Sequence, residues 1–193
     1  MARIEGIPPT AANPLLRLSE WMTRRRFGRS MEPLRGYARS NPVMIALAGL
    51  EMGMERARHV DPRLRGLAEL RVAALVGCRF CLDIGSLVVR RLGVPAPQLL
   101  DLNRHAESAA FSAEEKAVLE YADRMTATPV TVRDEDVVRL RAFLDERQLV
   151  ELTAAIAHEN LRARMNHALG YGAEGFSNGG VCALPAVEAE ATH

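Results

Sequence analysis

The stretch "LAELRVAALVGCRFCLDIGS", residues 67–86, decides how this chain folds. Its first part places apolar residues at helical spacing up to Gly77, and a second helical pattern begins at Cys78. A glycine between two such patterns ends one helix and lets the next start in a new direction. The stretch therefore predicts two consecutive helices, with Cys78 and Cys81 in the first turn of the second.

The rest of the chain continues this helical pattern. Pro, Gly, Asn, Asp and Ser residues separate the segments, and Ser112 precedes Glu115 by three residues, as in a capping box. No segment shows the alternating pattern of a β-strand. We therefore expect an all-α protein, a compact helical bundle, with helices over residues 14–28, 30–40, 42–59, 62–76, 78–92, 96–104, 112–127, 134–144 and 146–170.

Length and composition predict one domain. A chain of 193 residues with 48% hydrophobic content can bury one sizeable core. Beyond Gly170 the composition shifts to glycine and small residues, which bury too little apolar surface to become ordered without docking. We expect a single domain over residues 1–177 and a flexible C-terminal tail over 178–193, with Cys182 as an exposed thiol.

The charge balance argues against several classes of partner. The 25 basic and 24 acidic residues nearly cancel, so the chain has no overall field that would attract nucleic acid or an anionic membrane. The arginine cluster at 24–29 has Phe27 as its only aromatic residue and is expected to be a solvated or interface-paired surface. The apolar run at 43–54 is too short to span a bilayer and contains Glu51. We expect a cytoplasmic protein that has no nucleic-acid or membrane partner.

The cysteine pair allows several interpretations. A closed zinc site needs four ligands, and this pair supplies two, so His158 or His167 would have to be brought to it by the fold. A thioredoxin-like site would follow a β-strand, whereas a helical pattern precedes this pair. We therefore expect neither a metal nor a cofactor. Two buried cysteines without chemistry remain an alternative.

A helix-borne dithiol fits the spacing. A thiol in a first helical turn faces unpaired backbone N–H groups and the positive end of the helix dipole, which stabilise a thiolate. This favours Cys78 most directly. Residues three apart in a helix lie on one face, so the sulfurs of Cys78 and Cys81 are expected to be close enough to form a disulfide. The pattern favours a reversible dithiol.

Three segments together resemble a known family. The quoted stretch, "FSAEEKAVLEYADRMTATPVTV" and "LVELTAAIAHENLRARMNHALGYGAEGFS" resemble, in this order, the carboxymuconolactone decarboxylase-like family and within it the alkylhydroperoxidase D-like branch, over about residues 30–177. The resemblance implies an all-helical homo-oligomer with thiol peroxidase, or peroxiredoxin-type, activity. It also implies a hydroperoxide substrate and re-reduction by a dithiol donor such as a lipoylated or thioredoxin-like protein. The decarboxylases of the family generally lack the cysteine pair, so its presence favours the redox branch.

The chain departs from the pattern of this branch at the proton relay. One glutamate and two histidines of that pattern are replaced here by Gly66, Phe80 and Gly85. A peroxidase needs a base to generate the thiolate and an acid for the leaving alkoxide. Glu69 is the leading substitute, because it lies in an apolar helix nine residues before the motif. The predicted catalytic residues are Cys78, Cys81 and Glu69.

Other polar residues are weaker candidates. Asp83 points away from the two sulfurs on its own helix, and His158 could shuttle protons if it lay near the thiols. The run "ENLRARMNH", residues 159–167, is expected to be a polar seam that orders the subunit or its interface. Two other functions stay open: a non-catalytic helical oligomer with a structural or redox-sensing cysteine pair, and a decarboxylase-like enzyme.

Overall fold

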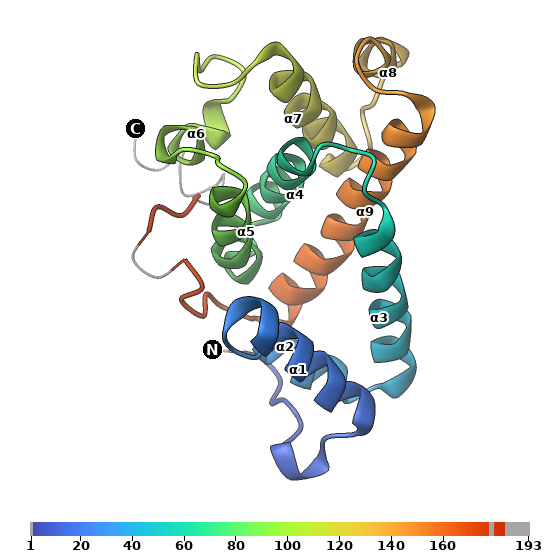
Figure 1. Ribbon diagram of the computed structural model, residues 1–193, viewed down its shortest axis with the longest axis vertical. Helices are drawn as coiled ribbons and strands as arrows, with labels where there is room; N and C mark the ends of the chain where they lie inside the picture. Colours follow the sequence, from blue (N-terminus) through green and yellow to red (C-terminus); the bar gives the residue numbers. More distant parts are fainter. Residues whose placement is uncertain (1, 178–179, 184–193) are drawn as a thin grey trace.

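The computed structural model describes residues 2–177 and 180–183, and Figure 1 shows their arrangement. Within this part every regular element is a helix, which confirms the all-α prediction. The α-helices are α1 (Pro14–Phe27), α2 (Glu32–Tyr37), α3 (Asn41–Arg56), α4 (Pro62–Val76), α5 (Arg79–Arg91), α6 (Ala96–Leu100), α7 (Ala113–Thr126), α8 (Asp134–Arg141) and α9 (Glu146–Leu169), with short 3-10 helices η1 (Pro9–Ala11) and η2 (Leu102–Arg104).

Helix α4 lies at the centre of the bundle. It packs against α5, α7 and α9, which surround it in Figure 1. Leu67 and Leu70 are almost completely buried in one core cluster, and Val72 is buried in a second cluster on another side of the helix. Such burial on several sides is typical of a core helix, whereas a surface helix buries a single stripe. The end of α4 therefore delivers the cysteine pair into the interior of the molecule.

The N-terminal helices form a smaller unit beside the central bundle. Leu16, Ala38 and Met44 make their own buried cluster, contributed by α1, the residue after α2, and α3. Helix α3 runs beside α9 (Figure 1), and the two helices are in contact. This arrangement brings Tyr37, at the end of α2, and Glu51, on α3, toward the residues of α9.

The junction between α4 and α5 follows from Gly77. Its φ of 73° lies in the left-handed region, which glycine adopts without a steric penalty. The Gly77 N–H donates to Ala74 O at 3.2 Å, and the Cys78 N–H donates to Ala73 O at 3.0 Å. This is the hydrogen-bond pattern of a Schellman motif. The residue that closes the motif, Cys78, is also the N-cap of α5.

Several predicted helices differ from those observed. The helix expected over 30–40 is shorter, as α2 (Glu32–Tyr37), and the helix expected over 134–144 ends at Arg141. The helix expected over 42–59 ends at Arg56. At this end the Arg65 guanidinium donates to Met54 O at 2.8 Å and to Ala57 O at 3.1 Å, so it takes the place of the N–H groups of a further helical turn. The helix expected over 96–104 breaks at Asp101 into α6 and η2. The Asp101 carboxylate accepts a hydrogen bond from Ser108 Oγ at 2.7 Å, which favours a turn over a continued helix.

The predicted exposure of Cys182 is wrong. The Ala183 N–H donates to Ser86 Oγ at 3.1 Å, and Ala183 is buried against α5. Cys182 is half-buried, with its Sγ 3.4 Å from Ser86 Oγ, and burial raises the pKa of its thiol. Residues 180–183 therefore pack against α5, while the other residues of the expected tail, 178–179 and 184–193, lie outside the described residues.

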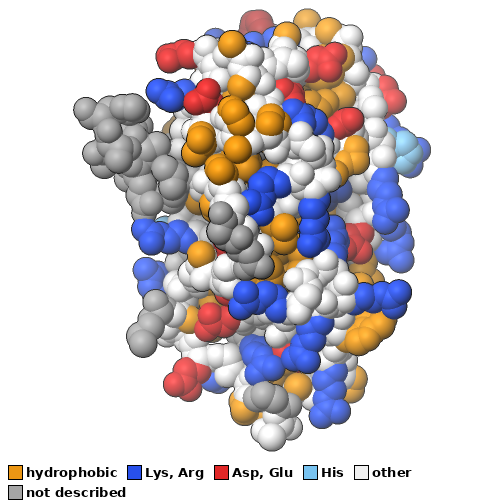
Figure 2. All heavy atoms as spheres, turned by 60° about the vertical axis from the view of Figure 1, so that its left-hand side comes forward, with side chains coloured by type: hydrophobic (Ala, Val, Ile, Leu, Met, Phe, Trp, Pro, Cys, Tyr) orange, Lys and Arg blue, Asp and Glu red, His pale blue; other side chains and the backbone are white. Residues whose placement is uncertain are grey.

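One face of the molecule carries side chains of every type. Figure 2 shows acidic, basic and hydrophobic side chains interspersed over one face of the molecule. Among the described residues, no helix is long and apolar enough to cross a membrane.

Candidate active site

The two cysteines of the motif meet at the start of α5. Their Sγ atoms lie 2.6 Å apart, and both are free thiols. Cys78 is completely buried, and Cys81 is 6% exposed. The prediction that the two sulfurs lie close enough to form a disulfide is therefore confirmed, although Cys78 is the N-cap of α5 and only Cys81 belongs to its first turn. The sulfurs need only a small movement to form a disulfide bond, whose length is about 2.0 Å.

The two sulfurs have different surroundings. Cys78 Sγ accepts a hydrogen bond from the Cys81 N–H at 3.2 Å, so it caps the first turn of α5. The hydrogen bond with Cys78, burial and the negative charge of Glu159 raise the pKa of the Cys81 thiol well above its usual value. These surroundings therefore favour the neutral thiol form of Cys81.

A buried amide connects Cys81 to α2. Asn166, on α9, donates from Nδ2 to Cys81 Sγ at 3.4 Å. Its Oδ1 accepts a hydrogen bond from the Tyr37 hydroxyl. Burial, together with the nearby cysteines, raises the pKa of Tyr37, so this hydroxyl stays a donor. The tyrosine thereby fixes the orientation of the amide, whose N–H group faces the sulfur.

A carboxylate on α9 also lies near Cys81. Glu159 is 4% exposed, and its negative charge acts on the Cys81 thiol. Arg162 binds the same carboxylate through Nε at 2.9 Å and also through its NH2 group. On its other side Arg162 donates from NH1 to Glu51 at 3.0 and 3.3 Å. A charged chain therefore leads from the buried dithiol to Glu51, whose side chain is 45% exposed.

The ionisation of these acids follows from their surroundings. Burial raises the pKa of Glu159, and the charge of Glu69 adds to this effect, while Arg162 opposes it. For Glu51, burial also disfavours the charge, but Arg162 and His158 outweigh it and lower the pKa to about 2. Glu51 is thus the permanent counter-ion of Arg162, and Glu159 is the carboxylate that is more readily protonated.

Glu69, the predicted catalytic acid, lies near this chain. It is half-buried on α4, and its Oε1 accepts a hydrogen bond from Arg65 Nε at 2.9 Å. Its charge acts on Glu159 and Arg162. Within the part of the chain that the structure describes, the carboxylate of Glu69 is bound to Arg65 and not to either cysteine. A catalytic role for Glu69 therefore stays a prediction.

The positions of the missing relay are filled by packing. A Cβ atom at Gly66 would lie 3.0 Å from Val89 Cγ1, and one at Gly85 would lie 3.0 Å from Leu70 Cδ1. Phe80 packs edge-on against Phe176, with ring centroids 6.1 Å apart. Because α4 and α5 are in close contact at the two glycines, a larger side chain at either position would require Val89 or Leu70 to shift.

Asp83 and the two histidines serve other contacts. The Asp83 carboxylate accepts four hydrogen bonds of 2.7–2.9 Å from the backbone N–H groups of Glu174, Phe176 and Ser177 and from the Ser177 hydroxyl. It holds the segment after α9 against α5. His158 Nε2 lies 3.3 Å from Glu51 Oε1, and His167 Nδ1 lies 3.1 Å from Gly77 O.

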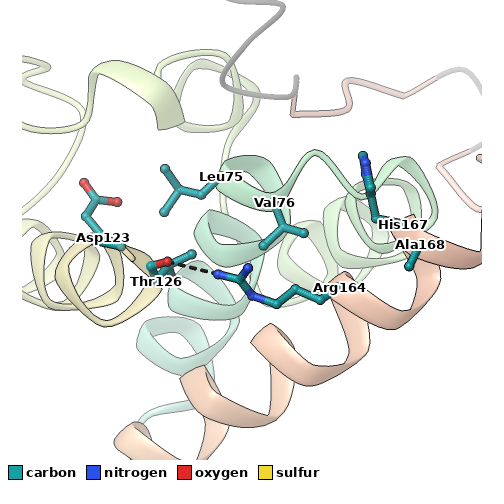
Figure 3. A pocket seen from close by; sticks show the side chains of 8 residues that line it. Leu75, Val76, Asp123, Thr126, Arg164, His167 and Ala168 are labelled. Carbon is teal, nitrogen blue, oxygen red and sulfur yellow. Dashed lines mark hydrogen bonds between the residues drawn. The ribbon is translucent and has the colours of Figure 1, made fainter. Parts of the chain in front are cut away.

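A surface cavity of about 540 Å³ lies between the ends of α4, α7 and α9. Figure 3 shows Leu75 and Val76 on its floor, Asp123 on one side and His167 on the other. Arg164 crosses it and donates to Thr126 O at 3.1 Å. The cysteines do not line this cavity, although one of its residues, His167, contacts Gly77, the residue before Cys78.

Sequence reasoning missed Glu159 and Tyr37. Glu159 falls in the run that was interpreted as a polar seam, far from the cysteines in the chain. A signal was present, because residues 152, 155, 159, 163 and 166 fall on one face of the predicted helix. That face joins Leu152, Ala155 and Ala163 to two polar residues, Glu159 and Asn166, and all five are buried. Polar residues on an apolar face mark a site that needs a partner.

These features define a class of protein: an all-α bundle with a buried dithiol at a helix start. Among the described residues, no group of three His, Cys, Asp or Glu residues could hold a metal ion. The model of the carboxymuconolactone decarboxylase family matches residues 42–124. The chain belongs to this family.

The chain is similar to proteins across this fold. It is 38% identical over 183 residues to the uncharacterised protein YnjA of Escherichia coli K12, covering 93% of this chain and 97% of YnjA. The structure resembles the debrominase Bmp8, with a TM-score of 0.78, 18% identity and coverage of 91% and 94%. It also resembles an uncharacterised peroxidase-related protein of Ralstonia eutropha described as an alkylhydroperoxidase AhpD core, with a TM-score of 0.79, 16% identity and the same coverage.

Proposed function

We propose that this protein is a thiol-dependent peroxidase that cycles Cys78 and Cys81 between dithiol and disulfide. The observation that carries the proposal is the contact of the two thiols at 2.6 Å at the start of α5. The Cys81 N–H supports negative charge on Cys78 Sγ, and the surroundings of Cys81 favour its neutral thiol form. Cys78 is therefore the nucleophile, and Cys81 is the thiol that resolves the first product.

The reaction uses two electrons and two protons. The Cys78 thiolate attacks the terminal oxygen of a hydroperoxide, the O–O bond breaks, and the alkoxide leaves with a proton as an alcohol. Cys78 now carries a sulfenic acid. The Cys81 sulfur attacks Cys78 Sγ and displaces hydroxide, which is protonated to water. A dithiol donor, such as a lipoylated or thioredoxin-like protein, then reduces the disulfide by exchange.

Relatives of the same fold support this class of chemistry. The Ralstonia eutropha protein is described as peroxidase-related, and Bmp8 is a debrominase. The Cys-to-Ala variant of Bmp8 has been crystallised with 2,3,4-tribromopyrrole, so a brominated pyrrole is a useful second substrate in any test. Decarboxylation without the cysteines, and a structural or redox-sensing pair in a non-catalytic oligomer, are the competing functions.

The proposal is tested with a panel of hydroperoxides and dithiol donors. All proteins carry Cys182→Ser, so that the third thiol does not contribute. We expect the parent to consume peroxide and to show a Cys78–Cys81 linked peptide by mass spectrometry. Cys78→Ser should lose about 10²-fold or more of the rate. Cys81→Ser should stop after the first step, with a sulfenic acid at Cys78 that dimedone traps.

Glu69→Gln is an additional variant in this panel. If Glu69 is the acid and base, turnover falls by about 10²- to 10⁴-fold with the melting temperature unchanged. If Glu69 only anchors Arg65, the melting temperature falls and turnover per folded molecule is unchanged. In the protein that retains all three cysteines, a pair that stays reduced while Cys182 is oxidised would overturn the redox function altogether.

A further inference from the structure

We infer that Glu159 is the general base that takes the proton of Cys81 when Cys81 closes the disulfide, and that Arg162 and Glu51 hold Glu159 in place for this task. The inference rests on the dithiol cycle proposed above. It assigns to α9 the proton relay that the resemblance places at positions 66, 80 and 85, where this chain has two glycines and a phenylalanine.

The first support is position. Glu159 and Asn166 are buried on the same face of α9, and Asn166 donates to Cys81 Sγ at 3.4 Å, so this face of α9 packs against Cys81. The negative charge of Glu159 acts on the Cys81 thiol, which is the group that must lose its proton. Arg162 binds Glu159 through Nε and NH2 and cannot accept a proton itself. Asn166 donates to Cys81 Sγ and is available to stabilise the sulfur as it becomes negative.

The second support is charge. A buried base can accept a proton at low cost only if its protonation does not leave another buried charge without a partner. Arg162 has two carboxylate partners, so when Glu159 becomes neutral, Arg162 remains paired with Glu51. The proton moves from a neutral thiol to an anionic carboxylate, and the net charge of the buried cluster stays the same. Burial raises the pKa of Glu159, which favours uptake of the proton.

The step balances as follows. Cys78 Sγ carries a leaving group, which is hydroxide after reaction with peroxide or a thiolate after reaction with a disulfide. Cys81 transfers its proton to Glu159, its sulfur attacks Cys78 Sγ, and the bond to the leaving group breaks with both electrons. Glu159 then returns the proton to the departing hydroxide or to solvent. Glu159 takes the proton of the reacting thiol and is catalytic, while Arg162 and Glu51 are positioning residues.

The experiment uses a dipyridyl disulfide under anaerobic conditions, in the Cys182→Ser background. Attack by Cys78 releases one coloured thiopyridone, and attack by Cys81 on the mixed disulfide releases a second. The two phases report on the two cysteines separately, and neither requires a peroxide. Glu159→Gln should keep the first phase and slow the second by about 10²-fold near neutral pH.

Glu115→Gln is the matched control. Glu115 is also buried and bound to an arginine, Arg63, at 2.8 Å, but it belongs to the capping box of α7. Both phases should keep the parent rate in this variant. A second phase of unchanged rate in Glu159→Gln overturns the inference. A parent that reacts in both phases but consumes no peroxide overturns the proposed function and leaves the inference intact.

The pH profile distinguishes a base from a structural residue. Without the base, the second phase depends on spontaneous ionisation of Cys81 and should rise about tenfold per pH unit between about pH 6 and pH 8, more steeply than in the parent. If both proteins have the same slope, Glu159 has a structural role only. Glu159→Asp keeps a carboxylate and should retain the slope of the parent at a lower rate, and it replaces the Gln variant if that variant does not fold.

The other groups that titrate or carry charge here come from four helices. They are Arg162 and His158 on α9, Glu69 on α4, Glu51 on α3 and Tyr37 on α2. The pKa of Glu51 is about 2, and burial raises that of Tyr37, so neither changes charge in the range of the assay.

Discussion

At the scale of single residues, the molecule uses buried carboxylates for two different purposes. Glu159 is held by one arginine and faces a thiol. Asp83 is only 2% exposed, and four N–H and O–H donors surround it, all from the segment after α9. Burial disfavours its charge, but the hydrogen bonds from Ser177, Phe176 and Glu174 outweigh burial and lower its pKa. Asp83 is therefore a structural anchor.

Asp83→Asn should destabilise the protein by about 1–3 kcal/mol at neutral pH, because an amide cannot accept all four hydrogen bonds. A lowered pKa means that the stabilisation is complete above the pKa of the unfolded state, about 3.9, and is lost as pH falls through the lower pKa of the folded state. The difference between parent and variant should therefore shrink below about pH 4. Urea unfolding at several pH values measures it. The exposed Glu107→Gln is the control, and a pH-independent difference would contradict this account.

At the scale of helices, local signals predicted what lies within one segment. Helix α4 begins and ends where Pro62 and Gly77 indicate, and the capping box at Ser112 starts α7. Contacts made across the chain were not predictable in this way. The Arg65 side chain donates to carbonyl groups at the end of α3, and Glu159 lies near Cys81 because α9 packs against both α4 and α5. The closeness of Cys78 and Cys81 could be predicted from one segment of the sequence. The place of Glu159 near them could not, because it depends on how two helices pack.

Gly77→Ala tests the junction of α4 and α5. An alanine with a φ of 73° is strained by about 1–2 kcal/mol. Gly93 has a φ of 83° at the far end of α5, so Gly93→Ala should cost a similar amount of stability. Only Gly77 precedes Cys78, and only Gly77→Ala should also slow the first phase of the dipyridyl disulfide reaction. Thermal unfolding and the thiopyridone signal are the measurements, and equal thiol rates in both variants would count against the junction as the device that positions Cys78.

At the scale of the whole molecule, the dithiol is buried, and one apolar face of α3 is exposed to solvent. On α3, Ile45 and Met52 are 61% and 48% exposed, although both are large and apolar. Gly49 and Gly53, on the same face, have no atoms near the place where a side chain would start. Small and apolar residues together allow two helices to approach closely. This face fits the expectation of a homo-oligomer.

We expect light scattering to show a dimer or a larger assembly, and Ile45→Glu to shift it toward the 21.2 kDa monomer. A charge at the centre of an apolar contact is costly, because it loses water without gaining a partner. Val138 on α8 is also exposed, at 69%, and Val138→Glu should leave the assembly unchanged. A parent protein that scatters as a monomer at micromolar concentration would refute the oligomer.

The Sγ atom of Cys78 has two roles that exclude each other: it caps α5, and it forms the proposed disulfide with Cys81. In the reduced protein it caps α5 by accepting the Cys81 N–H. A sulfur bonded in a disulfide carries no charge and is a poorer acceptor, so oxidation gives up the free energy of the cap. A reduced form that is stabilised in this way makes the corresponding disulfide a stronger oxidant. The reduction potential of the pair and the stability of the first turn of α5 are therefore thermodynamically linked, and any reductant that opens a Cys78–Cys81 disulfide also restores the cap of α5.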